Sequence, residues 1–203
     1  MLWKFSIYIM LILSAQLTFI GCQKPQTNPG SSIGKNVQPL VTLTGGQQKQ
    51  KELAIAAKEK LFQSLLGELT ESMGENGPGK SISVCKTRAP EIAAAIGKET
   101  GVRIGRTSIK LRNPGNRPPD WAVSFVTNQI ENEVEVELPE NGLGVLLPIR
   151  LKATCTLCHG TDDQVMPEVR AAIATDYPED QATGFAEGDL RGYFWVEVPK
   201  LQD

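Results

Sequence analysis

The sequence predicts a domain of the α+β class, with helices packed on one antiparallel sheet of about four or five strands. Residues 134–138 and 145–151 alternate apolar and polar side chains on either side of a turn, which is typical of a β-hairpin. A further alternating segment spans residues 190–198. Residues 47–74 and 81–101 instead carry apolar side chains at helical spacing.

The first 21 residues have the pattern of a secretory signal peptide. Lys4 precedes an apolar run over residues 5–20, and Gly21-Cys22 follows. A lipobox here makes Cys22 the lipidated first residue of the mature chain. Phe19 stands where a lipobox usually has leucine, so a short uncleaved membrane anchor is the alternative. Both alternatives predict an exported protein, held at a bacterial membrane and facing the periplasm or the exterior.

Residues 22–46 are rich in proline, glycine and serine and show little apolar periodicity. This composition predicts a flexible tether, which leaves residues 47–203 as the folded domain.

A long amphipathic helix is predicted over residues 47–74. Leu61, Leu65, Leu69 and Met73 recur every four residues and form one apolar stripe. We expect the stripe to pack on the core, and homodimerisation through this helix is the alternative.

A second helix is expected to begin with Ser81 as its N-cap, to be kinked or restarted at Pro90, and to end at Gly101. Residues 102–112 look extended and residues 113–119 form a loop. Asp120 is expected to cap a third helix that buries Trp121.

The second hairpin strand leads directly towards Cys155, and the hairpin is expected to bury one face. Pro167 suits the first turn of a short helix. In the last strand Phe194, Val196 and Val198 face one way, whereas Tyr193 and Trp195 face the other.

Composition narrows the classes of function. The chain has 203 residues and a formal net charge of -2, which argues against a nucleic-acid partner. Its four cysteines are too few for a disulfide scaffold at this length.

The strongest motif is Cys155-Thr156-Leu157-Cys158-His159. Two cysteines separated by two residues and followed at once by histidine form the attachment site of a c-type haem. The thiols of Cys155 and Cys158 add across the two porphyrin vinyl groups, and His159 becomes an axial ligand of the iron. His159 is the only histidine in the chain.

Two other interpretations use the same residues. Cys85, Cys155, Cys158 and His159 form a Cys₃His set for a zinc-stabilised binding lipoprotein, although adjacent ligands such as Cys158 and His159 are unusual in structural zinc sites. A redox-active dithiol is the other, but it leaves the histidine unexplained.

The second axial ligand is left open by the residues alone. Met73, Met166, Cys85, a lysine and no ligand at all are the alternatives. Cys85 is expected in the first turn of its helix, where the helix dipole and nearby basic side chains favour the ligating thiolate. A small buried thiol in the core is the competing interpretation.

Several stretches resemble a bacterial c-type haem domain family, the Tll-type haem domain, long catalogued as a domain of unknown function. They are Val84-Cys85, Ala89-Pro90-Glu91-Ile92-Ala93, Gly105-Arg106-Thr107-Ser108, Arg112-Asn113-Pro114-Gly115-Asn116, the haem motif with Gly160, and Gly188-Asp189-Leu190-Arg191-Gly192. The resemblance implies a PAS-like fold, one covalently bound haem c, and iron ligation by His159 and Cys85. It also implies redox or gas sensing, or electron transfer.

The sequence therefore predicts a membrane-tethered c-type haem protein in electron transfer or redox sensing, with a redox or signalling protein as partner. A gas sensor in which Cys85 is displaced is the alternative. No enzymatic activity is expected, because a peroxidase usually needs a second histidine. Arg106, Lys110 and Arg112 are candidates for contacts with haem propionates.

Overall fold

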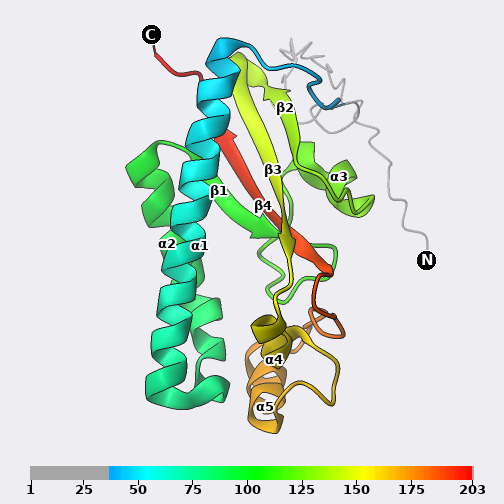
Figure 1. Ribbon diagram of the computed structural model, residues 1–203. Coiled ribbons are helices and arrows are strands. Elements are labelled where there is room, and N and C mark those ends of the chain that lie inside the picture. Colours follow the sequence, from blue (N-terminus) through cyan, green and yellow to red (C-terminus); the bar gives the residue numbers. More distant parts are fainter. Residues whose placement is uncertain (1–36, 203) are drawn as a thin grey trace, which may run out of the picture. The chain divides into compact units, whose positions relative to one another are not determined.

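The computed structural model describes residues 37–202 and contains a four-stranded antiparallel sheet (Figure 1). Its strands are β1 (Arg103–Thr107), β2 (Val134–Leu138), β3 (Gly142–Arg150) and β4 (Leu190–Val198). Their order across the sheet is β1-β4-β3-β2. The α+β class predicted from the sequence is confirmed.

Five α-helices accompany the sheet in the described part of the chain. They are α1 (Gly45–Lys80), α2 (Ile82–Thr100), α3 (Val123–Thr127), α4 (Thr156–His159) and α5 (Pro167–Asp176). Short 3₁₀ turns precede α3 and α4, at Asp120–Ala122 and Ala153–Cys155, and a third joins the hairpin strands at Pro139–Asn141.

The sheet is buried on both faces. On one face α1 and α2 cover Val145, Phe194 and Val196. On the other face the segment from Trp121 to α3 covers Leu146 and Tyr193. The expectation that the hairpin buries only one face is wrong for β3, because β3 is an inner strand with an apolar layer on each side.

Helix α1 begins two residues earlier than expected. The Thr44 hydroxyl accepts a hydrogen bond from the Gln47 amide, and the Gln47 side chain accepts one from the Thr44 amide, so the two form a capping box. Upstream of the cap, the Leu40 amide donates to the Glu135 carbonyl over 2.8 Å. Residues 37–44, which the sequence placed in the tether, therefore lie against the domain.

The glycine-rich break between α1 and α2 is present, but two predicted caps are wrong. Gly77 has φ 78° and interrupts the helical geometry near the end of α1. The Ser81 hydroxyl donates to the Gly77 carbonyl over 2.8 Å, so it does not cap α2. Asp120 likewise makes no side-chain cap, since it lies inside its 3₁₀ turn. Gly101 ends α2 with φ 73°, as expected, whereas Pro90 lies within the helix without ending it.

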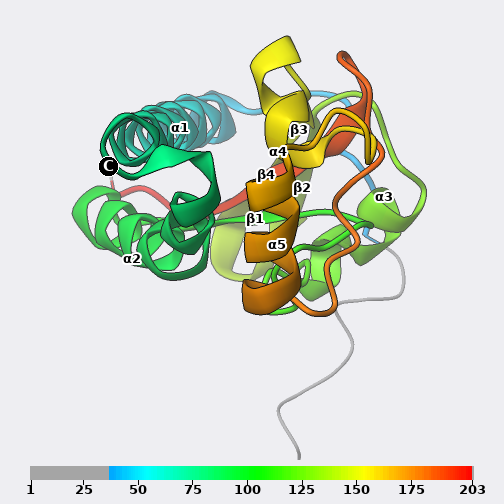
Figure 2. The ribbon, with the colours of Figure 1, turned by 90° about the horizontal axis from the view of Figure 1, so that it is seen from below.

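Helices α4 and α5 lie beyond the end of the sheet (Figure 1), and the view from below shows them in front of the strands (Figure 2). They bury a third apolar cluster, formed by Ile82, Val165, Val169, Ile173 and Tyr177. Ile82 comes from the start of α2, so this cluster connects α2 to the haem-motif region.

The expected signal peptide, Cys22 and the tether up to residue 36 lie outside the described residues. Within residues 37–202, no helix combines the length and the apolar character needed to cross a membrane.

Candidate functional site

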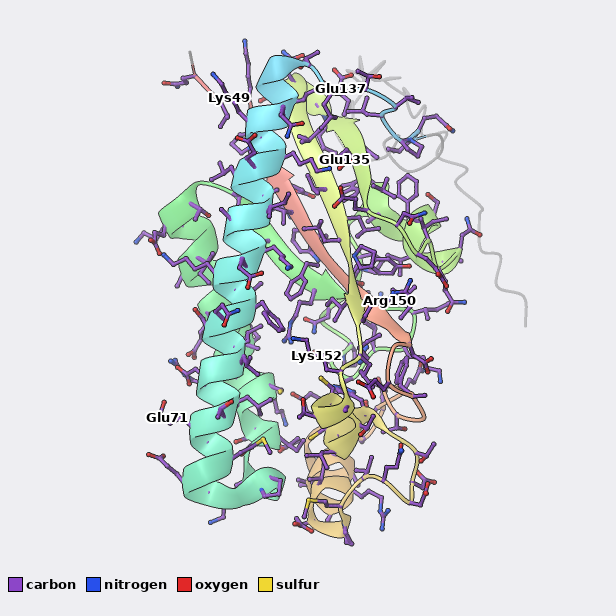
Figure 3. The ribbon with its side chains drawn as sticks, viewed as in Figure 1. Lys49, Glu71, Glu135, Glu137, Arg150 and Lys152 are labelled. Carbon is purple, nitrogen blue, oxygen red and sulfur yellow. The ribbon has the colours of Figure 1, made fainter. Side chains whose placement is uncertain are left out.

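The haem-motif segment begins where β3 leaves the sheet. Figure 3 shows Arg150 and Lys152 at this exit, where the chain passes towards α4. The Leu151 amide donates to the Asp189 carbonyl over 3.0 Å, and the Gly188 amide donates to the Leu151 carbonyl over 2.8 Å. These two bonds hold the start of the segment against the loop that leads into β4.

His159 is held in one tautomer. Its Nδ1 atom lies 2.7 Å from the carbonyl oxygen of Ala182 and 3.3 Å from Nε of Arg191. Nδ1 cannot donate to the first and accept from the second at once, and the shorter contact with a pure acceptor assigns the proton to Nδ1. The lone pair on Nε2 is then free to bind a metal, which is the usual arrangement of a histidine ligand.

Burial and charge keep this imidazole neutral. Removal from water lowers the pKa of His159 well below its usual value, and the neighbouring guanidinium groups of Arg191 and Arg112 lower this pKa further. A neutral imidazole is the form that ligates a metal.

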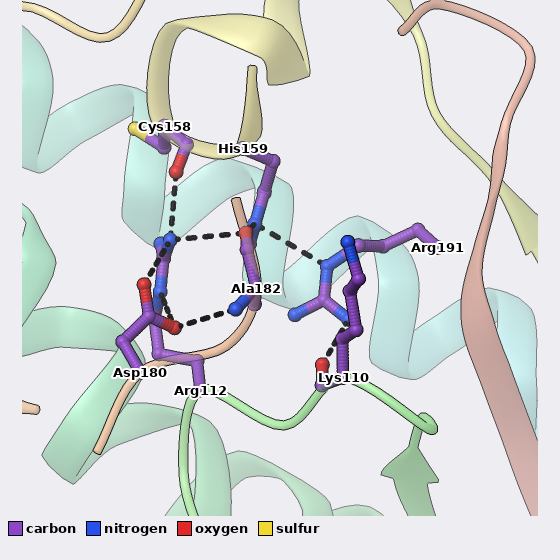
Figure 4. Close-up of polar contacts among 7 residues, drawn as sticks. All are labelled: Lys110, Arg112, Cys158, His159, Asp180, Ala182 and Arg191. Atoms are coloured by element: carbon purple, nitrogen blue, oxygen red, sulfur yellow. Dashed lines mark hydrogen bonds and ion pairs between the residues drawn. The ribbon is translucent and has the colours of Figure 1, made fainter. Parts of the chain in front are cut away.

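A buried ion pair supports the segment that holds His159 (Figure 4). Arg112 forms two hydrogen bonds with the Asp180 carboxylate, over 3.1 and 3.2 Å. Both side chains are only 7% exposed. Nη2 of Arg112 also donates to the carbonyl oxygens of Cys158, at 2.7 Å, and of Ala182, at 3.3 Å.

The chain from 182 to 185 runs beside the motif. The Phe185 amide donates to the His159 carbonyl over 3.0 Å, and the Gly184 amide donates to the Gly160 carbonyl over 2.7 Å. Backbone bonds and the buried ion pair thus fix the motif on this side.

Residues predicted to bind the haem line one cavity of about 180 Å³. Cys85, Cys155 and His159 all line it, together with Arg106, Tyr177 and Arg191. Cys85 and the motif are 70 or more residues apart in the chain, and the fold brings them to the same space. Cys158 is not part of this lining and packs against the third apolar cluster, where burial raises the pKa of its thiol.

Two positively charged side chains of the cavity, Arg106 and Arg191, have no carboxylate partner in the part of the chain that the structure describes. Burial lowers the pKa of both guanidinium groups, that of Arg191 to about 10. Two unpaired guanidinium groups beside a histidine and a thiol suit a flat metal-containing ligand with anionic groups at its edge.

Not all candidates from the sequence belong to this cavity. Arg106 and Arg112 line it, although Arg112 is engaged with Asp180. Lys110 is exposed, and its Nζ lies 5.0 Å from the centre of the Phe185 ring, outside the lining. Met73 and Met166 are also absent from the lining, so among the sulfur-containing candidates for the second axial ligand only Cys85 lines this cavity with Cys155 and His159.

Three residues of the site had no role assigned from the sequence: Tyr177, Asp180 and Arg191. Burial raises the pKa of Tyr177, so its phenol stays protonated beside Cys85. Leu190 packs on the same apolar cluster as Tyr193 and Trp195, and the register between β3 and β4 shifts beside it. Arg191, the next residue, contacts His159, so strand alternation in the sequence gave no signal for its position.

A second cavity, of about 270 Å³, shares Cys85 and Arg106 with the first. Its other walls come from α1, α2, β1, the loop after β1 and β4, and include Leu61, Ala94 and Trp195. Cys85 therefore borders two spaces, and only one of them contains His159.

No group of three or more histidine, cysteine or acidic side chains in residues 37–202 is arranged to hold a metal ion by itself.

The family known as Tll0287-like matches residues 31–199 of the sequence. The chain belongs to the Tll0287-like family. Its fold is similar to the crystal structure of the cyanobacterial heme-protein Tll0287, with a TM-score of 0.55 and 26% sequence identity. The similarity covers 79% of this chain and 99% of that chain. The suspected Tll-type family and its PAS-like α+β fold are thereby confirmed. No curated protein matches the chain.

Proposed function

We propose that this Tll0287-like protein binds one haem c covalently and serves in electron transfer or redox sensing at a bacterial membrane. One observation carries the proposal. Cys155, Cys85 and a histidine whose Nδ1 is already engaged line the same cavity. The relative Tll0287, named a heme-protein, supports haem as the ligand of this cavity.

The residues have distinct roles in this proposal. The thiols of Cys155 and Cys158 add across two vinyl groups of the porphyrin, each S–H adding to one C=C bond to form a thioether. His159 would hold the haem iron through Nε2, and Cys85 would hold it through its sulfur. Arg106 and Arg191 bind the propionates. Cys158 has to turn out of the apolar cluster in which it now packs.

The haem, when bound, supplies one-electron exchange. A thiolate from Cys85 donates electron density and lowers the reduction potential relative to histidine and methionine ligation. Lipid on Cys22 holds the domain at the membrane, where it exchanges electrons with a protein partner.

Spectra of the full chain, expressed in a host with c-type haem maturation, test this proposal. We expect haem that resists acidified acetone extraction, and a ferric spectrum that changes in Cys85→Ala. Lys86→Gln is a matched control on α2, because Lys86 is exposed and pairs with Asp176. Haem that acidified acetone extracts from the wild type would refute covalent attachment, and an unchanged spectrum in Cys85→Ala would refute the ligand assignment.

The second cavity favours one further candidate, a gas sensor in which Cys85 gives way to an external ligand. Space behind Cys85 allows its side chain to move away from the haem position. Carbon monoxide binding by the reduced wild type supports the sensor, and a reduced spectrum unaffected by carbon monoxide supports the carrier.

A further inference from the structure

The ion pair between Arg112 and Asp180 makes hydrogen bonds both to Ala182 and to the backbone of the haem motif. Asp180 accepts hydrogen bonds from Nε of Arg112 over 3.1 Å and from the amide of Ala182 over 3.0 Å. Arg112 in turn donates to the Cys158 carbonyl over 2.7 Å. The ion pair thus contacts Cys158, which precedes His159, and Ala182, whose carbonyl accepts the hydrogen bond from Nδ1 of His159 (Figure 4).

We propose that Arg112 and Asp180 are positioning residues, which place the Ala182 carbonyl against Nδ1 and so fix the tautomer and the electron-donating strength of His159. An acceptor on Nδ1–H makes an imidazole a more basic ligand. Among residues 37–202, the other contact of Nδ1 is with Arg191, which offers a donor instead of an acceptor. Without the ion pair, the alternative tautomer with the proton on Nε2 is no longer excluded.

The geometry requires the fork of arginine. Nε and Nη2 of Arg112 together donate four hydrogen bonds, two to the Asp180 carboxylate and one each to the carbonyls of Cys158 and Ala182. Lysine offers one ammonium group on a flexible stem and cannot reproduce this planar arrangement. Arg112→Lys should therefore behave like Arg112→Gln, although it keeps the charge.

The first test needs no haem. His159 is the only histidine, so the full chain labelled with ¹⁵N-histidine gives one imidazole signal set by NMR. Before haem attachment we expect the proton on Nδ1 in the wild type, and a several-fold larger Nε2–H population in Arg112→Gln and Asp180→Asn. Arg103→Gln is the matched control, since the Arg103 side chain is 74% exposed and pairs with Glu197 instead of Asp180. Wild-type Nδ1–H populations in both variants would overturn the proposal.

The second test rests on the proposed haem function and measures the reduction potential of the haem-bound protein. A weaker Nδ1–H bond makes His159 a poorer donor, so both variants should raise the potential by about 59 mV, a tenfold change in the ferric–ferrous equilibrium. A pure charge effect would instead lower the potential in Arg112→Gln, because a nearby cation is lost. A lower potential in that variant therefore refutes positioning.

The two tests separate the two ideas. If the NMR result holds but no haem attaches in the maturation host, the haem function fails and the positioning role of the ion pair stands.

Discussion

Gly192 is the point at which β4 meets the end of β1, and we expect alanine there to destabilise the protein. A Cβ atom at this position would lie 2.3 Å from the Thr107 carbonyl oxygen and 2.9 Å from Cβ of Ser108. Backbone cannot swing aside as a long side chain can, so β1 and β4 would have to separate. Overpacking of this kind costs about 1–3 kcal/mol.

For a chain of this length, each kcal/mol lowers the melting temperature by about 2–4 °C. The loss should therefore be about 2–12 °C, measured by far-ultraviolet circular dichroism. Gly67→Ala provides the control, because Gly67 lies within α1 and its added Cβ meets no atom within 4 Å. Alanine there should stabilise the helix by up to about 1 kcal/mol. Equal melting temperatures for Gly192→Ala and the wild type, or a rise, would refute the steric argument.

Three other predictions concern the haem site and the membrane anchor. Cys155→Ala and Cys158→Ala should each keep one thioether, seen as a red-shifted pyridine haemochrome, and an unshifted band in either variant would show that its thiol is not used. Ala94→Trp should fill the second cavity, and in the sensor alternative it should slow carbon monoxide binding in flash photolysis at least several-fold; an unchanged rate would exclude this route. Cys22→Ser should move the protein from the membrane fraction to the soluble fraction, and continued sedimentation with membranes would contradict lipidation at that residue.

Local patterns predicted the sheet better than the helix caps. The alternation of Phe194 and Val196 against Tyr193 and Trp195 assigned the two faces of β4 correctly, because strand periodicity depends only on neighbouring residues. Ser81 has the residue type of a cap, but its hydroxyl bonds back to the last turn of α1 instead. The statistical preference of serine for the N-cap position does not predict this outcome, because the competing acceptor, the Gly77 carbonyl, is known only from the folded structure.

The sequence predicted two residues that line the first cavity, but it did not predict how the fold assembles that cavity. The spacing of the haem motif pointed to Cys155 and His159, and both line the cavity. The role of Arg191 depends on the pairing between β3 and β4, where the register shifts after Ile149. That irregularity lies next to Arg191, which contacts His159, and no periodic pattern encodes it.

The two sides of the proposed iron position differ in how firmly the chain holds them. His159 is fixed through Ala182, the Arg112–Asp180 pair and backbone bonds to residues 184 and 185. Cys85 stands on α2 between two cavities, with space on the side away from His159. A ligand-exchange switch needs one fixed iron ligand and one that can dissociate. An electron carrier exchanges electrons faster with two fixed ligands, because movement of a ligand slows electron exchange. On the proposed function, we expect any redox-linked change of ligand to occur at Cys85. Ligand exchange at Cys85 is therefore the observation that separates a redox switch from an electron carrier.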